Sequence, residues 1–274
     1  MPDPLERDEP SQGPARPKAG LASGVTGRIH RFGRTDSTNE RAFEAIAAKR
    51  ARDGDAFVAL EQTAGRGRLG RRWESAPGEG LYVSYVHLPE TPARPIPPPA
   101  ITMAAGLAVL DAVRALGLSG ARLDWPNDIV VGEAKLAGIL VESRGLDPAA
   151  PHFVIGIGVN VAQRSFSEEL RRERAVTSLA LEGSEHSPDE LLETLLPRLE
   201  ERLRQANTEH KKLTRDYLEG TGLAGALITL QADRGTVTGT LLDIDLTSGI
   251  RIEGTSGAHT IDLAHVRGLE RQRS

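Results

Sequence analysis

Four arginines and three glycines occur together in Gly65-Arg66-Gly67-Arg68-Leu69-Gly70-Arg71-Arg72-Trp73, hereafter the arginine–glycine loop. Its glycines match the G-x-G-x-x-G pattern of dinucleotide-binding loops, but that fingerprint requires a helix directly after the loop. Pro77 and Gly78 prevent a helix there, and strand-like runs lie on both sides, at residues 56–60 and 81–86. The segment is therefore a loop between two strands, and its glycines are not a dinucleotide-binding fingerprint.

The arginine–glycine loop is strongly basic, because no acidic residue follows until Glu74. Guanidinium groups bind phosphate or carboxylate through two parallel hydrogen bonds, and glycine lets the backbone approach a ligand closely. Trp73 is suited to stacking on a base. A solvated surface loop is the alternative for such a segment, but the glycine spacing and the tryptophan favour a binding loop for an anionic ligand.

Predicted helices and strands are interleaved over most of the chain. Strands are expected at residues 25–32, 56–60, 81–86, 121–125, 135–143 and 152–161, and helices at residues 37–51, 101–116 and 188–218. Ser37 and Glu40 are spaced as a helix capping box, and Pro197 is expected to kink or divide the last helix. Because the strands cluster, the pattern predicts an α/β or α+β fold with a mixed or largely antiparallel sheet.

The chain divides into three regions. Residues 1–24 are acidic and rich in proline, which predicts a disordered tail. Residues 25–220 carry the predicted helices and are expected to form one large domain. In residues 221–274, glycine-bearing turns separate short predicted strands, a pattern typical of a small β-barrel. These strands are expected at residues 226–231, 235–243, 249–253 and 259–263.

Composition excludes several classes of protein. The 274 residues suffice for one large domain or two unequal ones, at roughly 150 residues per domain. Lys+Arg 34 against Asp+Glu 38 gives a net charge of −4, which excludes a nucleic-acid-binding protein that acts through bulk positive charge. The chain has no cysteine, so disulfides, thiolate nucleophiles and cysteine-ligated metal sites are excluded. The seven histidines lack metal-binding spacing, and we expect neither zinc nor a protein-bound redox cofactor.

Hydropathy predicts a protein that does not span a membrane. No run approaches the roughly 20 apolar residues that cross a bilayer. The first residues lack the apolar core of a secretory signal. We therefore expect the protein in the cytoplasm.

Two further segments each allow two interpretations. In Trp125-Pro126-Asn127-Asp128, which follows a predicted strand, the residues are typical of a turn with a core tryptophan, and Lys135 is typical of a strand edge. Alternatively, the amide and carboxylate oxygens hold Mg²⁺ and Lys135 reaches the same phosphates. The run Gly-Ile-Gly-Val-Asn at residues 156–160 is either a bulged strand or one that a ligand or another backbone approaches closely.

Five segments, taken together and in this order, closely resemble those of the biotin protein ligase family. They are Ser37-Thr38-Asn39, Gln62 with the arginine–glycine loop, Trp125 to Asp128, residues 135–140 and residues 156–160. The resemblance extends over roughly residues 30–265. It implies a catalytic domain like that of class II aminoacyl-tRNA synthetases, with a mixed sheet and helices, followed by a small SH3-like β-barrel.

The resemblance also implies an activity, that of a biotin–[biotin carboxyl-carrier protein] ligase. Biotin and ATP would form biotinyl-5′-AMP and pyrophosphate, with Mg²⁺ as the metal cofactor. Biotin would then pass to one lysine of the biotin carboxyl carrier domain of acetyl-CoA carboxylase or a related carboxylase. Because the carboxylate of biotin is already ionised, the first step needs positioning and charge neutralisation rather than a base.

Site residues of the family carry over to matching positions of this sequence. The resemblance implies that biotin contacts Ser37, Thr38, Asn39, Gln62, Gly65, Arg66, Gly67, Arg68 and Lys135. It implies that ATP contacts Arg68, Arg71, Trp73, Asn127, Asp128 and Asn160. Lys135, Arg66 and Arg68 would be catalytic, and Asn127 and Asp128 would organise Mg²⁺ on the phosphates of ATP.

Two features depart from the family pattern. Asp124 stands before Trp125, where family members commonly have lysine. Fewer than thirty residues precede the first predicted strand, which favours the monofunctional form without an N-terminal DNA-binding domain. The sequence leaves both a monomer and a homodimer open.

Two other functions compete with this interpretation. A lipoate protein ligase has the same fold class and the same acyl-adenylate chemistry, but the arginine–glycine loop ending in Trp73 favours biotin. A nucleic-acid-binding module would use the arginines and the β-barrel. Residues 226–274 contain few aromatic residues for base stacking and the net charge is negative, so we expect no nucleic-acid partner.

Overall fold

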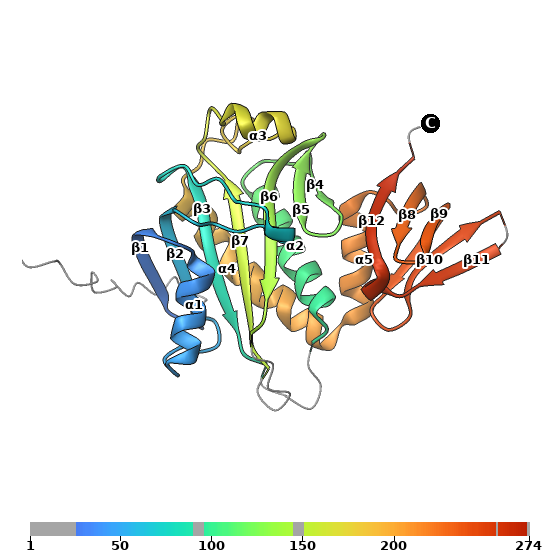
Figure 1. Cartoon of the computed structure of the whole chain (residues 1–274), viewed down its shortest axis with the longest axis horizontal. Helices are drawn as coiled ribbons and strands as arrows, with labels where there is room; N and C mark the ends of the chain where they lie inside the picture. Colours follow the sequence, from blue (N-terminus) through green and yellow to red (C-terminus); the bar gives the residue numbers. More distant parts are fainter. Residues whose placement is uncertain (1–25, 90–95, 145–150, 256, 273–274) are drawn as a thin grey trace, which may run out of the picture.

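The computed structural model describes residues 26–89, 96–144, 151–255 and 257–272, and it contains two sheets (Figure 1). The larger sheet has the strand order β1 (Ile29–Thr35), β2 (Ala56–Gln62), β3 (Gly80–His87), β7 (Phe153–Asn160), β6 (Ala134–Glu142), β5 (Asp128–Val131) and β4 (Ala121–Asp124). The smaller has the order β11 (Gly257–Ile261), β10 (Gly249–Gly254), β9 (Gly235–Asp245), β8 (Leu227–Ala232) and β12 (Val266–Arg271). The predicted disordered tail, residues 1–24, lies outside the described residues.

Strand pairing in the larger sheet is mixed. β1 and β2 run parallel, whereas every other neighbouring pair is antiparallel. This confirms the mixed, largely antiparallel sheet that the strand clustering predicts. Because β2 and β3 are antiparallel neighbours, the arginine–glycine loop leaves and re-enters the same end of the sheet.

Successive side chains of β7 point to opposite faces of the larger sheet. Ile155, Ile157 and Val159 belong to the main hydrophobic core, together with residues of α2 (Pro98–Ala115) and α4 (Pro188–Thr208). The residues between them, Gly156 and Gly158, face the other side, where α1 (Thr38–Ala47) packs (Figure 1). The missing side chains of these glycines leave room on the α1 side of the sheet.

The N-terminus of α1 lacks the expected capping box. The helix begins directly after Ser37 but ends at Ala47, earlier than predicted, and the Ser37 side chain makes no capping hydrogen bond. Glu40 instead pairs with Arg66 and Arg144. The prediction is wrong because two guanidinium groups engage the Glu40 carboxylate more strongly than a backbone N–H would.

The helical region predicted at residues 188–218 is divided, but not at Pro197. α4 is continuous through Pro197, and the break falls at Glu209, after which α5 (His210–Thr221) begins. Fully buried leucines at 195, 196 and 199 hold the helix against the core, which outweighs the one backbone hydrogen bond that proline removes.

Among the described helices, none is long and apolar enough to cross a membrane.

Several short elements escape sequence analysis. β5, α3 (Glu168–Glu173) and β12 are not predicted, and β1 begins at Ile29 rather than at residue 25. β12 pairs with β8, so the C-terminal sheet has five antiparallel strands where four were expected. Elements of four to six residues span too few periods for a hydrophobic pattern to reveal them.

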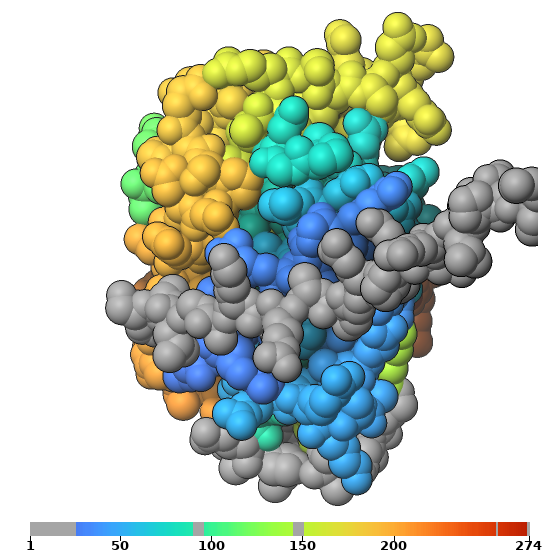
Figure 2. All heavy atoms as spheres, turned by 90° about the vertical axis from the view of Figure 1, so that its left-hand side faces the viewer, coloured from blue at the N-terminus to red at the C-terminus, as the bar shows by residue number. Residues whose placement is uncertain are grey.

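The edge strand β1 is fastened to α4. Thr26, just before β1, donates from its backbone nitrogen and hydroxyl to Glu200 Oε1 at 3.0 and 2.9 Å. Arg31 Nη1 lies 2.6 Å from Asp189 Oδ1. Figure 2 shows this side of the molecule, with the blue residues of β1 beside the orange residues of α4. These contacts tie the first strand to a helix more than 150 residues later in the chain.

Leu123 of β4 fits between two helices at positions where both carry glycine. A Cβ atom at Gly106 in α2 would lie 2.9 Å from Leu123 Cδ2, and one at Gly220 in α5 would lie 2.7 Å from Cδ1. The Leu123 side chain is 1% exposed. Leu123 therefore packs the larger sheet against α2 and α5.

Replacing Leu123 by alanine should destabilise the protein strongly. Leu123→Ala should lower the free energy of unfolding by about 2–5 kcal/mol, because helices that already pack closely collapse only partly into the cavity. Urea denaturation of both proteins measures this difference. Leu69→Ala is the control, since Leu69 is 92% exposed. An equal loss of stability in both variants would contradict the packing role of Leu123.

Candidate functional site

The arginine–glycine loop folds back on itself beside the sheet. Arg66 and Arg72 form an isolated antiparallel β-bridge. At its base, the backbone N–H of Trp73 donates to the carbonyl of Gly65 at 2.9 Å. This pairing places the Trp73 side chain over the α1 side of the sheet.

Trp73 lies directly on the glycines of β6 and β7. A Cβ atom at Gly158 would lie 2.5 Å from Trp73 Cε2, and one at Gly138 would lie 3.0 Å from Cζ3. A Cβ atom at Gly156 would lie 2.6 Å from Asn39 Oδ1. The glycines at 156 and 158 therefore mark a close approach, but not by another backbone, and approach by a ligand stays a prediction. The approaching groups are side chains of the chain itself rather than another backbone.

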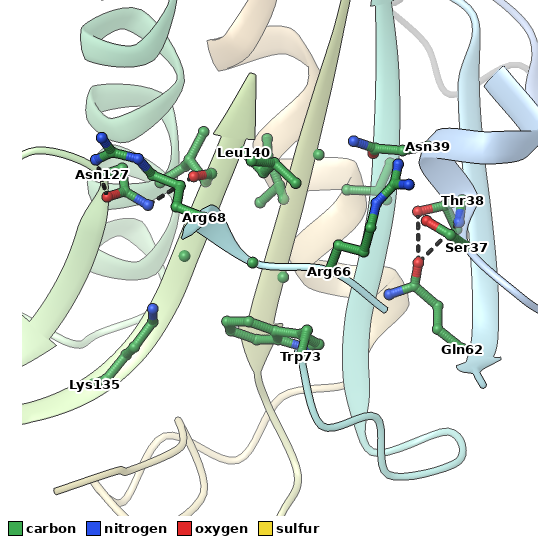
Figure 3. Close-up of a pocket in the computed structure, with 17 residues that line it drawn as sticks. Ser37, Thr38, Asn39, Gln62, Arg66, Arg68, Trp73, Asn127, Lys135 and Leu140 are labelled. Atoms are coloured by element: carbon green, nitrogen blue, oxygen red, sulfur yellow. Dashed lines mark hydrogen bonds between the residues drawn. The ribbon is translucent and has the colours of Figure 1, made fainter. Parts of the chain in front are cut away.

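Two neighbouring cavities adjoin Trp73, and Figure 3 shows the residues that line the first of them. The first cavity, of about 50 Å³, is lined by Ser37, Thr38, Asn39, Gln62, Arg66, Gly67, Arg68, Trp73, Val83, Asn127, Lys135, Gly138, Ile139, Leu140, Gly156, Ile157 and Gly158. The second cavity, of about 280 Å³, is lined by Gly67, Arg68, Leu69, Arg71, Arg72, Trp73, Glu74, Trp125, Pro126, Asn127, Asp128, Lys135, Asn160, Leu170, Glu173, Arg174, Val176 and Arg267. Five residues line both cavities: Gly67, Arg68, Trp73, Asn127 and Lys135.

The predicted site residues meet at these two cavities. Every residue expected to contact biotin lines the first cavity except Gly65, which instead accepts the backbone hydrogen bond of Trp73. Every residue expected to contact ATP lines the second cavity. Asn160 donates from Nδ2 to the carbonyl of Thr177 at 2.9 Å. The ligand contacts themselves stay predictions.

One end of the first cavity is a polar network, and the wall is apolar. Gln62 Oε1 accepts from the backbone N–H of Thr38 at 2.8 Å and from its hydroxyl at 3.1 Å. The Ser84 hydroxyl contacts Thr38 Oγ1 at 2.7 Å and also Asn39 Oδ1. Asn39 Nδ2 donates to Glu142 Oε2 at 2.6 Å. Sequence analysis missed Ser84 and Glu142, although a lone serine inside an apolar strand was a usable signal.

Arg66 fastens the arginine–glycine loop to α1 and β6. Its Nη1 lies 2.6 Å from Glu40 Oε1, and its Nη2 lies 3.1 Å from Glu142 Oε2. Arg144 also pairs with Glu40, so these four residues form an ion-pair cluster. The hydrogen bond from Arg144, with the charge of Arg66, lowers the pKa of Glu40 and keeps this carboxylate ionised. Arg66 is therefore neutralised in the cluster in this conformation.

A single carboxylate serves two cations in the second cavity. Asp128 Oδ1 lies 2.7 Å from Lys135 Nζ, and Asp128 Oδ2 lies 2.9 Å from Arg174 Nη1. Burial lowers the pKa of Lys135, and the charge of Asp128 opposes this effect. Lys135 Nζ also lies 5.5 Å from the centroid of the Trp73 ring, within cation–π range. Arg174 is a site residue that sequence analysis missed.

Asn127 connects the loop to the sheet. Its Oδ1 accepts from Arg68 Nη1 at 2.9 Å, and its Nδ2 donates to the carbonyl of Ile139 at 2.8 Å (Figure 3). The side-chain oxygens of both Asn127 and Asp128 thus face cationic groups. Within the described ranges, no group of three or more His, Cys, Asp and Glu residues is placed to hold a metal ion.

Loss of one carboxylate from the ion-pair cluster should loosen the arginine–glycine loop. In Glu40→Gln, trypsin should cut after the loop arginines about fivefold faster, because about 1 kcal/mol of ion pairing is lost and local opening becomes more frequent. Mass spectrometry of timed digests identifies the sites. Glu44→Gln is the matched control, since Glu44 lies on the same helix and pairs with Arg41 instead. Equal cleavage rates in the two variants would show that the cluster does not hold the loop.

Removing the charge of Asp128 should lower the pKa of Lys135 further. Burial, Arg174 and Arg71 all lower this pKa, and Asp128 opposes them. In Asp128→Asn the Lys135 amine should therefore become neutral, and react with an acylating reagent, at a lower pH than in the unmodified protein. Peptide mass spectrometry follows the labelling against pH, with exposed Lys212 as internal control. An unchanged or raised midpoint would contradict the electrostatic role of Asp128.

Comparison with known proteins places this site in a family. Residues 32–160 match the model of the biotin/lipoate A/B protein ligase family. The bifunctional ligase/repressor BirA of Salmonella typhimurium is 41% identical over 143 residues, 52% of this chain and 43% of that protein. The chain thus matches less than half the length of this relative.

Other relatives match over nearly their whole length. The biotin–[acetyl-CoA-carboxylase] ligase of Paracoccus denitrificans is 31% identical over 239 residues, 85% of this chain and 97% of that one. The structure of a biotin protein ligase from Aquifex aeolicus, in complex with biotin and ATP, superposes with a TM-score of 0.73 at 30% identity. That match covers 89% of this chain and 99% of the Aquifex chain. The chain therefore belongs to the biotin protein ligase family.

Proposed function

We propose that this chain is an ATP-dependent biotin protein ligase, which forms biotinyl-5′-AMP and transfers biotin to a lysine of a biotin carboxyl carrier domain. The observation that carries the proposal is the meeting of two cavities at Lys135. One cavity combines a polar end with an apolar wall, and the other is lined by several cations. The similarity to the Paracoccus ligase along almost its whole length supports the same conclusion.

The lining of the first cavity, rather than its volume of about 50 Å³, matches a ligand with a polar ring and an aliphatic chain. Thr38, Asn39 and Gln62 supply hydrogen-bonding groups at one end. The apolar wall comes from Val83, Ile139, Leu140 and Ile157. A ureido ring at the polar end would direct a valeryl chain along this wall, so that its carboxylate reaches Lys135 at the border of the two cavities.

The first reaction is a displacement at the α-phosphorus of ATP. A carboxylate oxygen of biotin forms a bond to phosphorus, the bond to the bridging oxygen breaks, and pyrophosphate leaves with the electron pair. Lys135 and Arg68 line both cavities, so they are placed to neutralise charge on the carboxylate and on the phosphate together. No base is required, because the nucleophile is already an anion.

The second reaction is acyl transfer. The neutral amine of the carrier lysine attacks the carbonyl carbon of biotinyl-5′-AMP, AMP leaves with the electron pair of the broken bond, and the new amide loses a proton to solvent. The arginine–glycine loop, fastened through Arg66, covers the first cavity and would shield the mixed anhydride from water.

Magnesium enters this proposal only with the phosphates of ATP, where it would neutralise charge. Asn127 and Asp128 remain the predicted contacts for that ion. The oxygens of both side chains already face Arg68, Lys135 and Arg174, which does not favour a metal ion held by the protein alone. We therefore derive no step through the metal.

Three finer points belong to the same proposal. The acceptor is the carrier domain of acetyl-CoA carboxylase or a related carboxylase, and the cytoplasm is the proposed compartment. The catalytic unit comprises residues 25–220, and the C-terminal unit comprises residues 221–274. Arg267 of the C-terminal sheet lines the second cavity, which supports a contribution of both units to the site.

Adenylate formation without any carrier protein tests the proposal. The purified protein, incubated with ATP, Mg²⁺ and either biotin or lipoate, should release pyrophosphate and form an acyl-adenylate with biotin only. Lys135→Ala and Arg68→Ala should each lower the rate about 100-fold or more, as loss of a charge-stabilising donor does elsewhere. Lys212→Ala, which changes an exposed side chain of α5, should leave the rate unchanged. A lipoyl-adenylate would favour the competing ligase, and no adenylate with either acid would refute the proposed reaction.

A further inference from the structure

Arg174 is held beside Lys135 by both backbone and side-chain contacts. The N–H of Lys135 donates to the carbonyl of Ala175, and the carbonyl of Lys135 accepts from the N–H of Thr177, each at 2.9 Å. The segment after α3 therefore runs alongside the start of β6. Arg174 projects from this segment to Asp128, and its side chain is 28% exposed. We propose that Arg174 binds the leaving pyrophosphate of ATP, with Asp128 as its positioning residue; this inference rests on the proposed function.

The charge balance of the second cavity favours an anion next to Arg174. Lys135 and Arg174 share the single carboxylate of Asp128, so one positive charge of this trio is not neutralised. Arg68 and Arg71 add further guanidinium groups to the same wall. Partly buried positive charge without a partner is unfavourable, and a polyphosphate that enters the cavity supplies the missing negative charge.

Arg174 also has hydrogen-bonding capacity left over. Its Nε is buried and has no hydrogen-bond partner among the described residues. One terminal nitrogen, Nη1, contacts Asp128. Since a guanidinium offers five N–H groups in a planar fork, Arg174 can keep Asp128 as a partner and still donate to phosphate oxygens.

The positions of Lys135 and Arg174 relative to the two cavities indicate that Arg174 contacts the leaving group. Lys135 lines both cavities, whereas Arg174 lines only the second. In a displacement at phosphorus the attacking and leaving oxygens lie on opposite sides of the phosphorus atom. If biotin attacks from the first cavity and Lys135 marks the α-phosphate, the pyrophosphate leaves into the second cavity, toward Arg174. There its guanidinium would stabilise the charge that develops on the leaving oxygen.

The alternative role of Arg174 is structural, as a brace between the end of α3 and the β4–β5 hairpin. The two roles predict different kinetics. A brace would alter stability and affect both substrates alike. A pyrophosphate-binding residue would affect ATP and pyrophosphate selectively.

Steady-state adenylate formation with the full-length chain distinguishes these roles. In Arg174→Ala, the KM for ATP and the inhibition constant of inorganic pyrophosphate should each rise about tenfold or more, as expected for loss of a charge-assisted hydrogen bond. The KM for biotin and the inhibition constant of AMP should stay within about twofold. Arg174→Lys keeps the charge but not the planar fork, so it should give intermediate values.

Arg172→Ala is the matched control. Arg172 lies in α3, two residues before Arg174, pairs with Glu168 and lines neither cavity, so all four constants should remain unchanged. If pyrophosphate inhibition in Arg174→Ala is unchanged, or weakens only as much as inhibition by AMP, the assignment is overturned. If Arg174→Ala proves unstable on thermal unfolding, Arg174→Lys decides by the same comparison.

Direct binding separates this inference from the proposed function. Calorimetric titration of inorganic pyrophosphate into the unmodified protein and into Arg174→Ala requires neither biotin nor turnover. Tighter binding by the unmodified protein, about tenfold or more, would support the anion site even if no adenylate formed. Equal binding by the two proteins would refute it even if the protein ligated biotin.

Discussion

Trp73 lies against the sheet because two side chains are absent beneath it. A Cβ atom at Gly138 or Gly158 would come within 3.0 Å of the indole ring, so a larger residue at either position displaces the ring. The backbone of Trp73 is hydrogen-bonded to Gly65, and the ring therefore also determines where the arginine–glycine loop lies. Lys135, whose Nζ is 5.5 Å from the ring centroid, lies beside the same ring. One steric constraint in two neighbouring strands thus organises both cavities.

Two arginines of one loop have different electrostatic surroundings. Arg66 lies between the carboxylates of Glu40 and Glu142, which neutralise it and anchor the loop. Arg68 donates only to the neutral amide of Asn127 among the described hydrogen bonds, so its charge remains available to an anion. The same residue type therefore holds the loop at one position and meets the proposed phosphates at the other.

The departure from the family pattern at Asp124 has a limited effect on the second cavity. Asp124 pairs in register with Asp128 across the β4–β5 hairpin, but it lines neither cavity. Burial raises the pKa of Asp124, with Asp128 contributing in the same direction and Arg122 opposing it. The positive charge around the proposed phosphates comes from other residues, chiefly Arg68, Lys135 and Arg174. The proposed chemistry therefore draws on these three cations rather than on position 124.

Local sequence determined the long elements and those bounded by glycine or proline. It also determined the residue types that chemistry at this site requires. Periodicity indicated α2 and α4, and the glycine–arginine pattern indicated a binding loop between strands. Tertiary structure decided the charge partners of Arg66 and Arg174, because these partners are distant in the chain: Arg66 and Glu142 are 76 residues apart, and Asp128 and Arg174 are 46 apart. It also decided which carboxylate caps a helix and which one anchors a loop, as Glu40 illustrates. A sequence lists charges in order, but only folding brings them to within ion-pair distance.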